Sequence, residues 1–189
     1  DLADKFKKDR KRNIFNKILN NKTLAMIFQK PSTRTRVSFD VAMMDLGGNT
    51  ISLSSNDIQL SRGETIRDTI KSLSCYVDVV MARVHNHCEV NELAKYSSIP
   101  IINGLSELYH PTQVLADLQT IREKKGRLKG LKLAWIGDGN NICNTLLIGC
   151  SRVGINMSVA SPLHYKPNMD NYNLVKKEFD KKLTEVVML

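Results

Sequence analysis

Short apolar runs alternate with longer amphipathic segments from residue 23 to residue 162. Runs of roughly four to eight residues are typical of buried strands, whereas apolar residues about three to four positions apart are typical of helices. On this basis the predicted strands are 23–28, 49–55, 78–84, 99–104, 131–137 and 155–162. The predicted helices are 35–48, 64–77, 89–97, 110–126 and 140–154.

Two of the predicted helices have apolar faces that should turn toward a core. The face of segment 35–48 carries Val37, Val41 and Met44. The face of segment 64–77 carries Ile66, Ile70, Leu73 and Val77. Residues at this spacing share one side of a helix, so we expect each set to be buried against a sheet.

The alternation of strands with helices predicts the α/β fold class, with parallel sheets that have helices on both faces. A polar break, KKGRLKG at 124–130, separates the first block of strands from the second. We therefore expect two α/β domains, the first at 1–124 and the second at 125–189.

The second block contains few strands. Segment 163–173 reads as a polar loop, 174–183 as a charged helix and 184–189 as the start of a strand. Because so few strands remain to complete a sheet, we expect an incomplete, Rossmann-like domain.

Composition is that of an ordinary globular protein, since 42% of the 189 residues are hydrophobic and 25% are charged. No stretch approaches the roughly 20 apolar residues that a membrane-spanning helix needs. The charged opening, DLADKFKKDRKR, contains no apolar signal region. We therefore predict no membrane partner.

The sequence contains four cysteines and no C-x-x-C pair. His85 and His87 lie close to Cys88, but their spacing matches no standard zinc pattern, so a metal site is disfavoured. Reduced thiols in the cytoplasm, or in the mitochondrial matrix of a eukaryote, are the simpler interpretation.

The net charge of +9 raises the alternative of a nucleic-acid-binding protein. The densest basic cluster, at 7–12, lies in a helix-like segment that also contains Asp residues. A solvated helix face explains this cluster better, and no zinc-finger or aromatic RNA-binding motif is present. We therefore predict no nucleic-acid partner, and a small anionic substrate explains localised arginines equally well.

The segment STRTR, at 32–36, places three hydroxyls and two guanidinium groups directly after the predicted strand 23–28. Ser32 is expected to cap the helix that contains Thr35 and Arg36. A helix N-terminus presents free N–H groups and a positive dipole end, and arginine binds phosphate in bidentate fashion. The pattern favours a phosphate site over a plain cap with surface arginines.

Other polar residues also follow predicted strands. Arg83 ends the strand 78–84, and His110 and Gln113 follow the strand 99–104. Ligands of open parallel sheets bind at the carboxyl ends of the strands, so these groups should converge on one crevice. The alternative for His110 and Gln113 is a capping histidine and a surface glutamine.

Two further loops carry candidate chemistry. GDGNN, at 137–141, resembles a dinucleotide-binding turn, but Ile142 replaces the third glycine, which disfavours a nicotinamide cofactor. Its two asparagines could instead orient a polar substrate. The loop NDIQLSRGET, with Gln59, Arg62 and Glu64, is either a solvent loop or an active-site loop that reaches a neighbouring subunit.

Five motifs occur in the order STRTR, SSNDIQLSRGET, VMAR, INGLSELYHPTQVLADL and WIGDGNN. Together they resemble the aspartate/ornithine carbamoyltransferase family over nearly all of residues 1 to 165. STRTR and HPTQ are shared by both branches of this family, whereas GDGNN and INGLSELYHP are similar to the ornithine branch.

The resemblance implies a role for each matching residue. The residues that match the carbamoyl-phosphate site are Ser32, Thr33, Arg34, Thr35, Arg83, His110 and Gln113. Arg34, Arg83 and His110 are the catalytic candidates among them. Gln59 matches a carbamoyl-phosphate-binding residue donated by an adjacent subunit of a homotrimer, and Asn141 matches a residue that binds ornithine.

The family's reaction is attack by the δ-amine of ornithine on carbamoyl phosphate, which yields citrulline and phosphate and serves arginine biosynthesis or catabolism. It implies no metal and no organic cofactor. Two alternatives remain open: a carbamoyltransferase for aspartate, putrescine or an acylated ornithine, and a non-enzymatic anion-binding module.

The sequence departs from the family pattern in one respect. The D-x-x-x-S-M-G and H-C-L-P segments that complete the ornithine site in the family are absent, and the chain does not begin with Met. We therefore expect a fragment that binds carbamoyl phosphate weakly and does not convert ornithine by itself.

Overall fold

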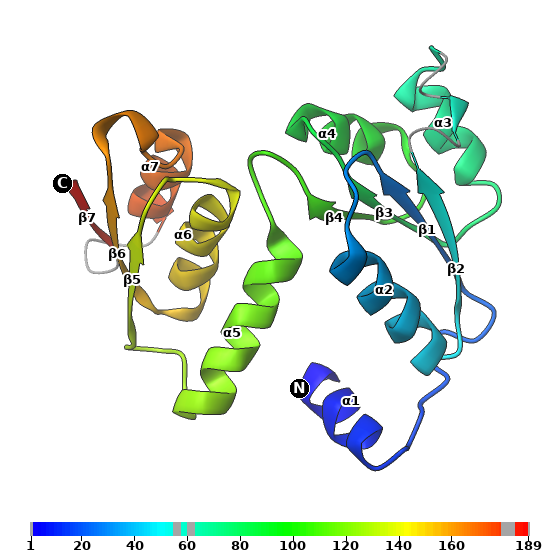
Figure 1. Cartoon of the computed structure of the whole chain (residues 1–189), viewed down its shortest axis with the longest axis horizontal. Coiled ribbons are helices and arrows are strands. Elements are labelled where there is room, and N and C mark those ends of the chain that lie inside the picture. The colour runs from blue at the N-terminus through cyan, green and yellow to red at the C-terminus, as the bar shows by residue number, and fades with distance from the viewer. Residues whose placement is uncertain (1, 55–57, 60–62, 179–183, 189) are drawn as a thin grey trace. The chain divides into compact units, whose positions relative to one another are not determined.

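The computed structural model describes residues 2–54, 58–59, 63–178 and 184–188. The chain forms two compact units, Asp1–Gly104 and Leu105–Leu189, and both are built from parallel strands and helices (Figure 1). The predicted α/β fold class is confirmed. None of the helices within the described residues is long and apolar enough to cross a membrane.

The first unit contains a four-stranded sheet in the order β2-β1-β3-β4. Its strands are β1 (Thr23–Phe28), β2 (Asn49–Ser54), β3 (Val79–Arg83) and β4 (Ile101–Leu105). Its helices are α1 (Leu2–Lys11), α2 (Thr33–Asp45), α3 (Ile66–Leu73) and α4 (His87–Tyr96). The central strand β1 pairs in parallel with β2 and β3, so these three strands end at one edge of the sheet.

Side chains of β1 point alternately into two cores. Ala25 and Ile27 join the cluster that α3 and α4 cover, whereas Leu24 and Met26 join the cluster that α2 covers. A strand buried on both faces must be apolar throughout. This requirement explains the uninterrupted run TLAMIF.

The predicted core face of α2 was wrong. Val37 and Met44 are 53% and 68% exposed, whereas Met43 is only 6% exposed and packs in the core together with Phe39. Phe39 and Met43 are four residues apart and also satisfy helical spacing, so the apolar pattern alone allowed two faces. The prediction for segment 64–77 is confirmed in its buried face, because Ile66, Ile70, Leu73 and Val77 all pack into one cluster, although α3 ends at Leu73 and Val77 follows it.

The second unit contains the sheet β5-β6-β7 with parallel strands. Its elements are α5 (Pro111–Lys125), β5 (Lys132–Ile136), α6 (Asn141–Val153), β6 (Asn156–Ser161), the 3-10 helix η2 (Leu163–Tyr165), α7 (Met169–Glu178) and β7 (Thr184–Met188). Val114 and Leu118 of α5 pack with α6 and β6 in the core of this unit. Contacts therefore divide the chain after residue 104, and the domain boundary placed between 124 and 125 stays a prediction.

The predicted loop 163–173 was partly wrong, because α7 begins at Met169. Asn168 Oδ1 accepts a hydrogen bond from the backbone N–H of Asn171 at 3.0 Å, as a helix-capping side chain does. The sequence showed this asparagine, but the polar residues around it resembled a loop. Residues 179–183 of the predicted helix lie outside the described residues.

The turn between β5 and α6 packs closely against the chain's own backbone. Gly139 N donates to Tyr165 O at 2.7 Å, and a Cβ atom at Gly139 would lie 2.0 Å from Pro167 N. In dinucleotide-binding folds a glycine of this turn lets a pyrophosphate approach the backbone. Here the segment that contains Tyr165 and Pro167 takes that space, which argues against a dinucleotide.

The cysteines divide into an exposed pair and a buried pair. Cys75 and Cys88 are exposed, whereas burial raises the pKa of both Cys143 and Cys150 to about 12.

Thiolates are the reactive species, so at pH 8 an aromatic disulfide reagent should titrate Cys75 and Cys88 quickly and the other two only after unfolding. A Cys75→Ser/Cys88→Ser variant is the control, and rapid labelling of this variant at either remaining cysteine would contradict the assignment.

We predict that Gly139→Ala separates the turn from the segment around Tyr165. Overpacking of this kind costs about 1–3 kcal/mol of unfolding free energy, which urea denaturation measures. Hydrogen exchange should accelerate at the amides of residues 139 and 165. Gly126→Ala is the control, because Gly126 has a positive φ of 72° but open space at its Cβ position. This variant should lose stability without the local change in exchange, and equal exchange in the two variants would refute the prediction.

Candidate functional site

The N-terminus of α2 has the geometry of an anion-binding site. Ser32 is the N-cap, and its Oγ accepts from the N–H of Thr35 at 3.4 Å, which confirms the predicted cap. The first turn contains no acidic residue. Among the described residues, none accepts a hydrogen bond from the N–H of Thr33 or Arg34. Two open donors at the positive end of a helix favour a negatively charged ligand.

Arg83 lies next to this helix terminus. It ends β3 and is paired with Phe28, the last residue of β1. Its Nη1 donates to Thr35 Oγ1 at 3.4 Å, so the strand end and the helix terminus contact each other through their side chains. The sequence-predicted residues Ser32, Thr33, Arg34, Thr35 and Arg83 are therefore brought together within the first unit.

The guanidinium of Arg83 retains an unused donor. Its Nε is buried and has no hydrogen-bond partner among the described residues. Partial burial lowers the pKa of Arg83, but a guanidinium stays charged at neutral pH. A buried charged donor without an acceptor is costly, and a bound anion would satisfy it.

Arg34 differs from Arg83 in its surroundings. Its side chain is exposed and has no ion pair or hydrogen bond with the described residues. Arg36 is also exposed and lies two positions further along α2, so its side chain leaves the helix in a different direction. Arg34 is thus the arginine of the first turn that can reach a ligand at the open amides.

The second unit holds the predicted residues His110, Gln113 and Asn141. His110 is the N-cap of α5 and Pro111 occupies the first turn, as expected. The N–H of His110 donates to Thr145 Oγ1 at 2.9 Å, and its Nδ1 lies 3.3 Å from Thr112 Oγ1. The side chain of Gln113 is exposed, and its Nε2 donates to Asp117 Oδ1 at 2.9 Å.

Asn141 and His110 are linked through Thr145. Thr145 Oγ1 accepts from His110 and donates to the carbonyl oxygen of Asn141 at 2.7 Å. Asn141 Nδ2 in turn donates to Ser106 O at 2.8 Å. Our sequence reasoning did not select Thr145. The signal that could have found it is its position four residues after Asn141 on the same helix face.

Asparagines extend this network into the segment before α7. Asn144 Oδ1 accepts from the N–H of Asn168 at 2.8 Å, and Tyr109 Oη donates to Asn171 Oδ1 at 2.5 Å. Asn171 is buried, and its Nδ2 has no partner among the described residues. The network holds the backbone at Ser106, Leu108 and His110.

Gln59 is not brought to either set. It is exposed, and its carbonyl oxygen accepts from Glu64 N at 3.1 Å within the same loop. Arg62 lies outside the described residues. Among the described residues no three His, Cys, Asp or Glu side chains are placed to hold a metal ion, His85 and Cys88 included.

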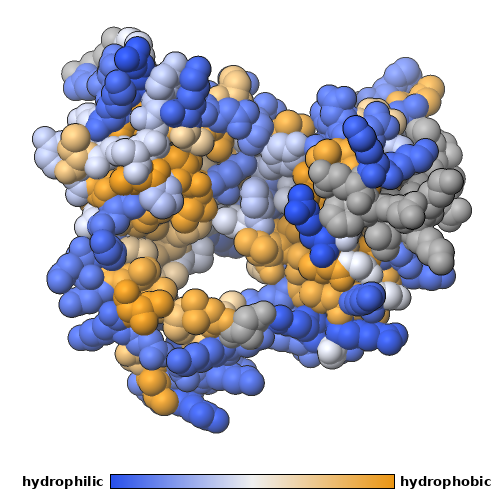
Figure 2. Space-filling view, turned by 180° about the vertical axis from the view of Figure 1, so that it is seen from behind, coloured by the Kyte–Doolittle hydropathy of each residue, from blue (hydrophilic) through white to orange (hydrophobic). Residues whose placement is uncertain are grey.

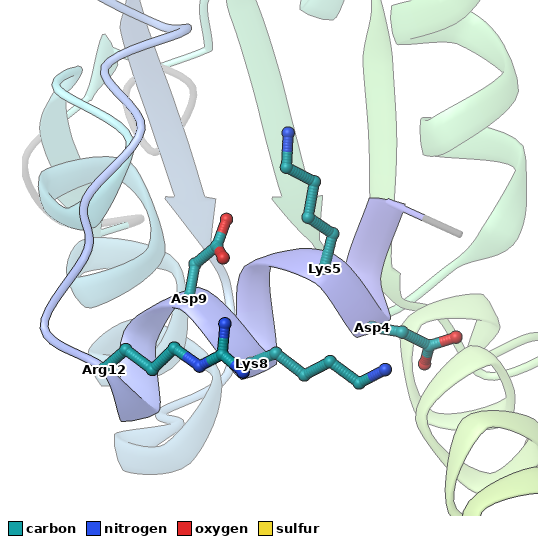
Figure 3. A pocket seen from close by; sticks show the side chains of 5 residues that line it. All are labelled: Asp4, Lys5, Lys8, Asp9 and Arg12. Atoms are coloured by element: carbon teal, nitrogen blue, oxygen red, sulfur yellow. The ribbon is translucent and has the colours of Figure 1, made fainter.

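A hollow in the first unit lies along α1, away from the predicted residues. It is lined by Asp4, Lys5, Lys8, Asp9 and Arg12 (Figure 3). These side chains all come from α1 and the residue after it, they carry both charges, and the basic ones are exposed. We attribute this feature to the solvated helix face predicted for the basic cluster.

Two family models match the sequence. The carbamoyl-P binding domain of the aspartate/ornithine carbamoyltransferases matches residues 1–123, and their Asp/Orn binding domain matches residues 129–188. The anion-binding terminus of α2 and Arg83 fall in the first match. His110 and Gln113 also fall in it, and Asn141 falls in the second.

Curated relatives are similar over most of the chain. The ornithine carbamoyltransferase of Cenarchaeum symbiosum (strain A) is 58% identical over 166 residues, which cover 88% of this chain and 55% of that protein. The ornithine carbamoyltransferase of Carboxydothermus hydrogenoformans is 50% identical over 188 residues, which cover 100% of this chain and 60% of that protein. The chain thus spans 55% to 60% of the length of these relatives.

Solved structures show the same fold. Ornithine carbamoyltransferase from Pyrococcus furiosus has a TM-score of 0.95 at 48% identity, with 98% of this chain and 60% of that chain covered. Aspartate transcarbamoylase from Trypanosoma cruzi, solved with carbamoyl aspartate and phosphate, has a TM-score of 0.91 at 26% identity, with 100% and 62% covered. On the strength of the two family models and of relatives at 50% identity or more, the chain belongs to the aspartate/ornithine carbamoyltransferase family.

Proposed function

We propose that the complete protein transfers the carbamoyl group of carbamoyl phosphate to the δ-amine of L-ornithine, which yields L-citrulline and phosphate. The observation that carries this proposal is the open N-terminus of α2 beside Arg83. It offers two free N–H donors, a hydroxyl-rich turn and a guanidinium with an unused, buried donor. This set matches a ligand that ends in a phosphate.

The choice of ornithine as the acceptor is supported by the relatives. Those at 50–58% identity are ornithine carbamoyltransferases, whereas the aspartate transcarbamoylase is 26% identical. A colour assay for the carbamoylated product should be run with ornithine and, in separate reactions, with aspartate, putrescine and acylated ornithine as acceptors. Turnover with one of these instead of ornithine would overturn the acceptor assignment.

The proposed reaction needs position and charge stabilisation more than it needs a reactive side chain. The amine nitrogen forms a bond to the carbonyl carbon, the bond from that carbon to the phosphate oxygen breaks, and phosphate leaves with the electron pair. The amine proton passes to the leaving phosphate. Orientation of two substrates contributes roughly 7–11 kcal/mol to such reactions. The acyl phosphate is already activated, so we propose no metal and no organic cofactor.

Each residue has a place in this scheme. Ser32, Thr33, Arg34 and Thr35 hold the phosphate, and Arg83 stabilises negative charge on the phosphate and carbonyl oxygens. His110 polarises the carbonyl, and Gln113 binds the carbamoyl amide. The backbone N–H of His110 is held by Thr145. Asn141 binds the ornithine backbone.

We further propose a homotrimer in which Gln59 of one subunit completes the carbamoyl-phosphate site of the next. Gln59 is exposed and has no hydrogen bond to the other site residues. Exposed apolar side chains, which Figure 2 shows as patches among hydrophilic ones, suit a chain with further interfaces. We place the protein in the cytoplasm, in arginine biosynthesis or catabolism.

We predict that Arg34→Ala in the complete protein lowers kcat/KM by about 100- to 1,000-fold. Loss of one positioned donor to transition-state charge costs about 2.7–4 kcal/mol. Steady-state kinetics with carbamoyl phosphate and ornithine measure this loss. Arg67→Ala is the control, because Arg67 is exposed on α3 and stacks on Tyr96 instead. An unchanged kcat/KM in Arg34→Ala would rule out the phosphate role.

We also predict complementation between inactive Gln59→Ala and Arg83→Ala variants. Random assortment in mixed trimers would leave about one quarter of the sites with both native residues. Unfolding and refolding the two variants together should therefore restore part of the activity, while either variant refolded alone stays inactive. Absence of any recovery, with mixed trimers demonstrated by differently tagged subunits, would show that sites are not shared.

A further inference from the structure

Gln29 joins the two elements of the anion-binding site. It directly follows β1 and precedes Ser32 by three residues, so it lies where the chain turns from the strand toward α2. Nothing in its local sequence distinguishes it from a surface glutamine. In the structure it is half-buried and contacts the segment that follows Arg83.

Three hydrogen bonds connect Gln29 to that segment. Its backbone N–H donates to the carbonyl oxygen of Arg83 at 2.9 Å. Its side-chain Oε1 accepts from the N–H of His85 at 2.8 Å, and its Nε2 donates to Glu89 Oε2. The side-chain amide is therefore used at both ends, once as an acceptor and once as a donor.

Glu89 anchors the side chain of Gln29 to α4. Its second oxygen, Oε1, accepts from the N–H of Asn86 at 3.2 Å and completes a capping box at the start of α4. Each carboxylate oxygen thus has one partner. Gln29 and Glu89 together tie β1, the turn after β3 and the beginning of α4 into one unit.

We propose that Gln29, anchored by Glu89, is a positioning residue that holds Arg83 against the N-terminus of α2. This inference rests on the proposed function. Gln29 forms hydrogen bonds with the backbone on either side of Val84, at Arg83 and His85. At the far end of the Arg83 side chain, the guanidinium contacts Thr35. Among the described residues the guanidinium has only one hydrogen bond, a long one to Thr35, so its placement depends on how firmly its backbone is held.

The chemistry of the pair explains why an amide stands at 29. A glutamate there could still accept from His85, but it would oppose the carboxylate of Glu89 and lose the donated hydrogen bond. An exchange of the two residues, Gln29→Glu with Glu89→Gln, preserves every contact. The new glutamine would donate to residue 29 and accept from Asn86, and the net charge would not change.

The exchange gives a direct test in the complete protein. Gln29→Glu should raise the KM for carbamoyl phosphate about tenfold or more, since it loses a hydrogen bond to a charged group and places two carboxylates together. The KM for ornithine should change less, because Asn141 and not Arg83 binds ornithine in the proposed scheme. The double variant should return the KM to within about threefold of the original value.

Two further variants keep the test decisive. Glu92→Gln is the charge control for the exchange. Like Glu89→Gln it removes one carboxylate from α4, three residues beyond Glu89, and it should leave the KM unchanged. Gln29→Met removes both side-chain hydrogen bonds without placing two carboxylates together. It should raise the KM even if Gln29→Glu fails to fold, which circular dichroism would reveal.

The outcomes separate this inference from the proposed function. If the original protein neither turns over carbamoyl phosphate nor is stabilised by it against heat, the proposed function fails and this inference with it. If the original protein is active and folded Gln29→Glu or Gln29→Met has the original KM, only the positioning role is refuted. A double variant as impaired as Gln29→Glu would equally overturn the pairing of Gln29 with Glu89.

Discussion

The parallel pairing of β1 with β3 is the constraint on which the first unit's site depends. This pairing sets Phe28 beside Arg83, so the chain that leaves β1 toward α2 passes the end of β3. Because the helix starts only a few residues later, its N-terminus must lie at the same edge of the sheet as the Arg83 side chain. A shift of one residue in register would turn Arg83 to the opposite face of the sheet.

The electrostatics of this edge follow from its construction. Open N–H groups at the start of α2 and a partly buried guanidinium bring positive potential to one place, and the first turn of α2 holds no acid to neutralise it. Such an arrangement is unfavourable without an anion and becomes favourable when one binds. Glu89 is close by, but both of its oxygens are occupied by hydrogen bonds to Gln29 and Asn86.

In the second unit, backbone packing and side-chain hydrogen bonds hold the candidate site residues in place. Gly139 lets the segment around Pro167 lie directly on the turn after β5, in the space that a pyrophosphate takes in dinucleotide-binding proteins. Hydrogen bonds through Thr145 and Asn144 then hold the segments that carry His110 and Asn141.

The sequence by itself determined the order and type of nearly every element from residue 23 to residue 162, and the cap at Ser32. These features depend on periodicity and on hydrogen bonds between residues close in the chain. The tertiary structure decided which face of α2 is buried, with Met43 inward and Met44 outward, and which atoms Gln29 and Arg83 contact. Those outcomes depend on strand order and register, and the contacts of Gln29 and Arg83 join residues 48 to 60 positions apart, which leave no trace in local pattern.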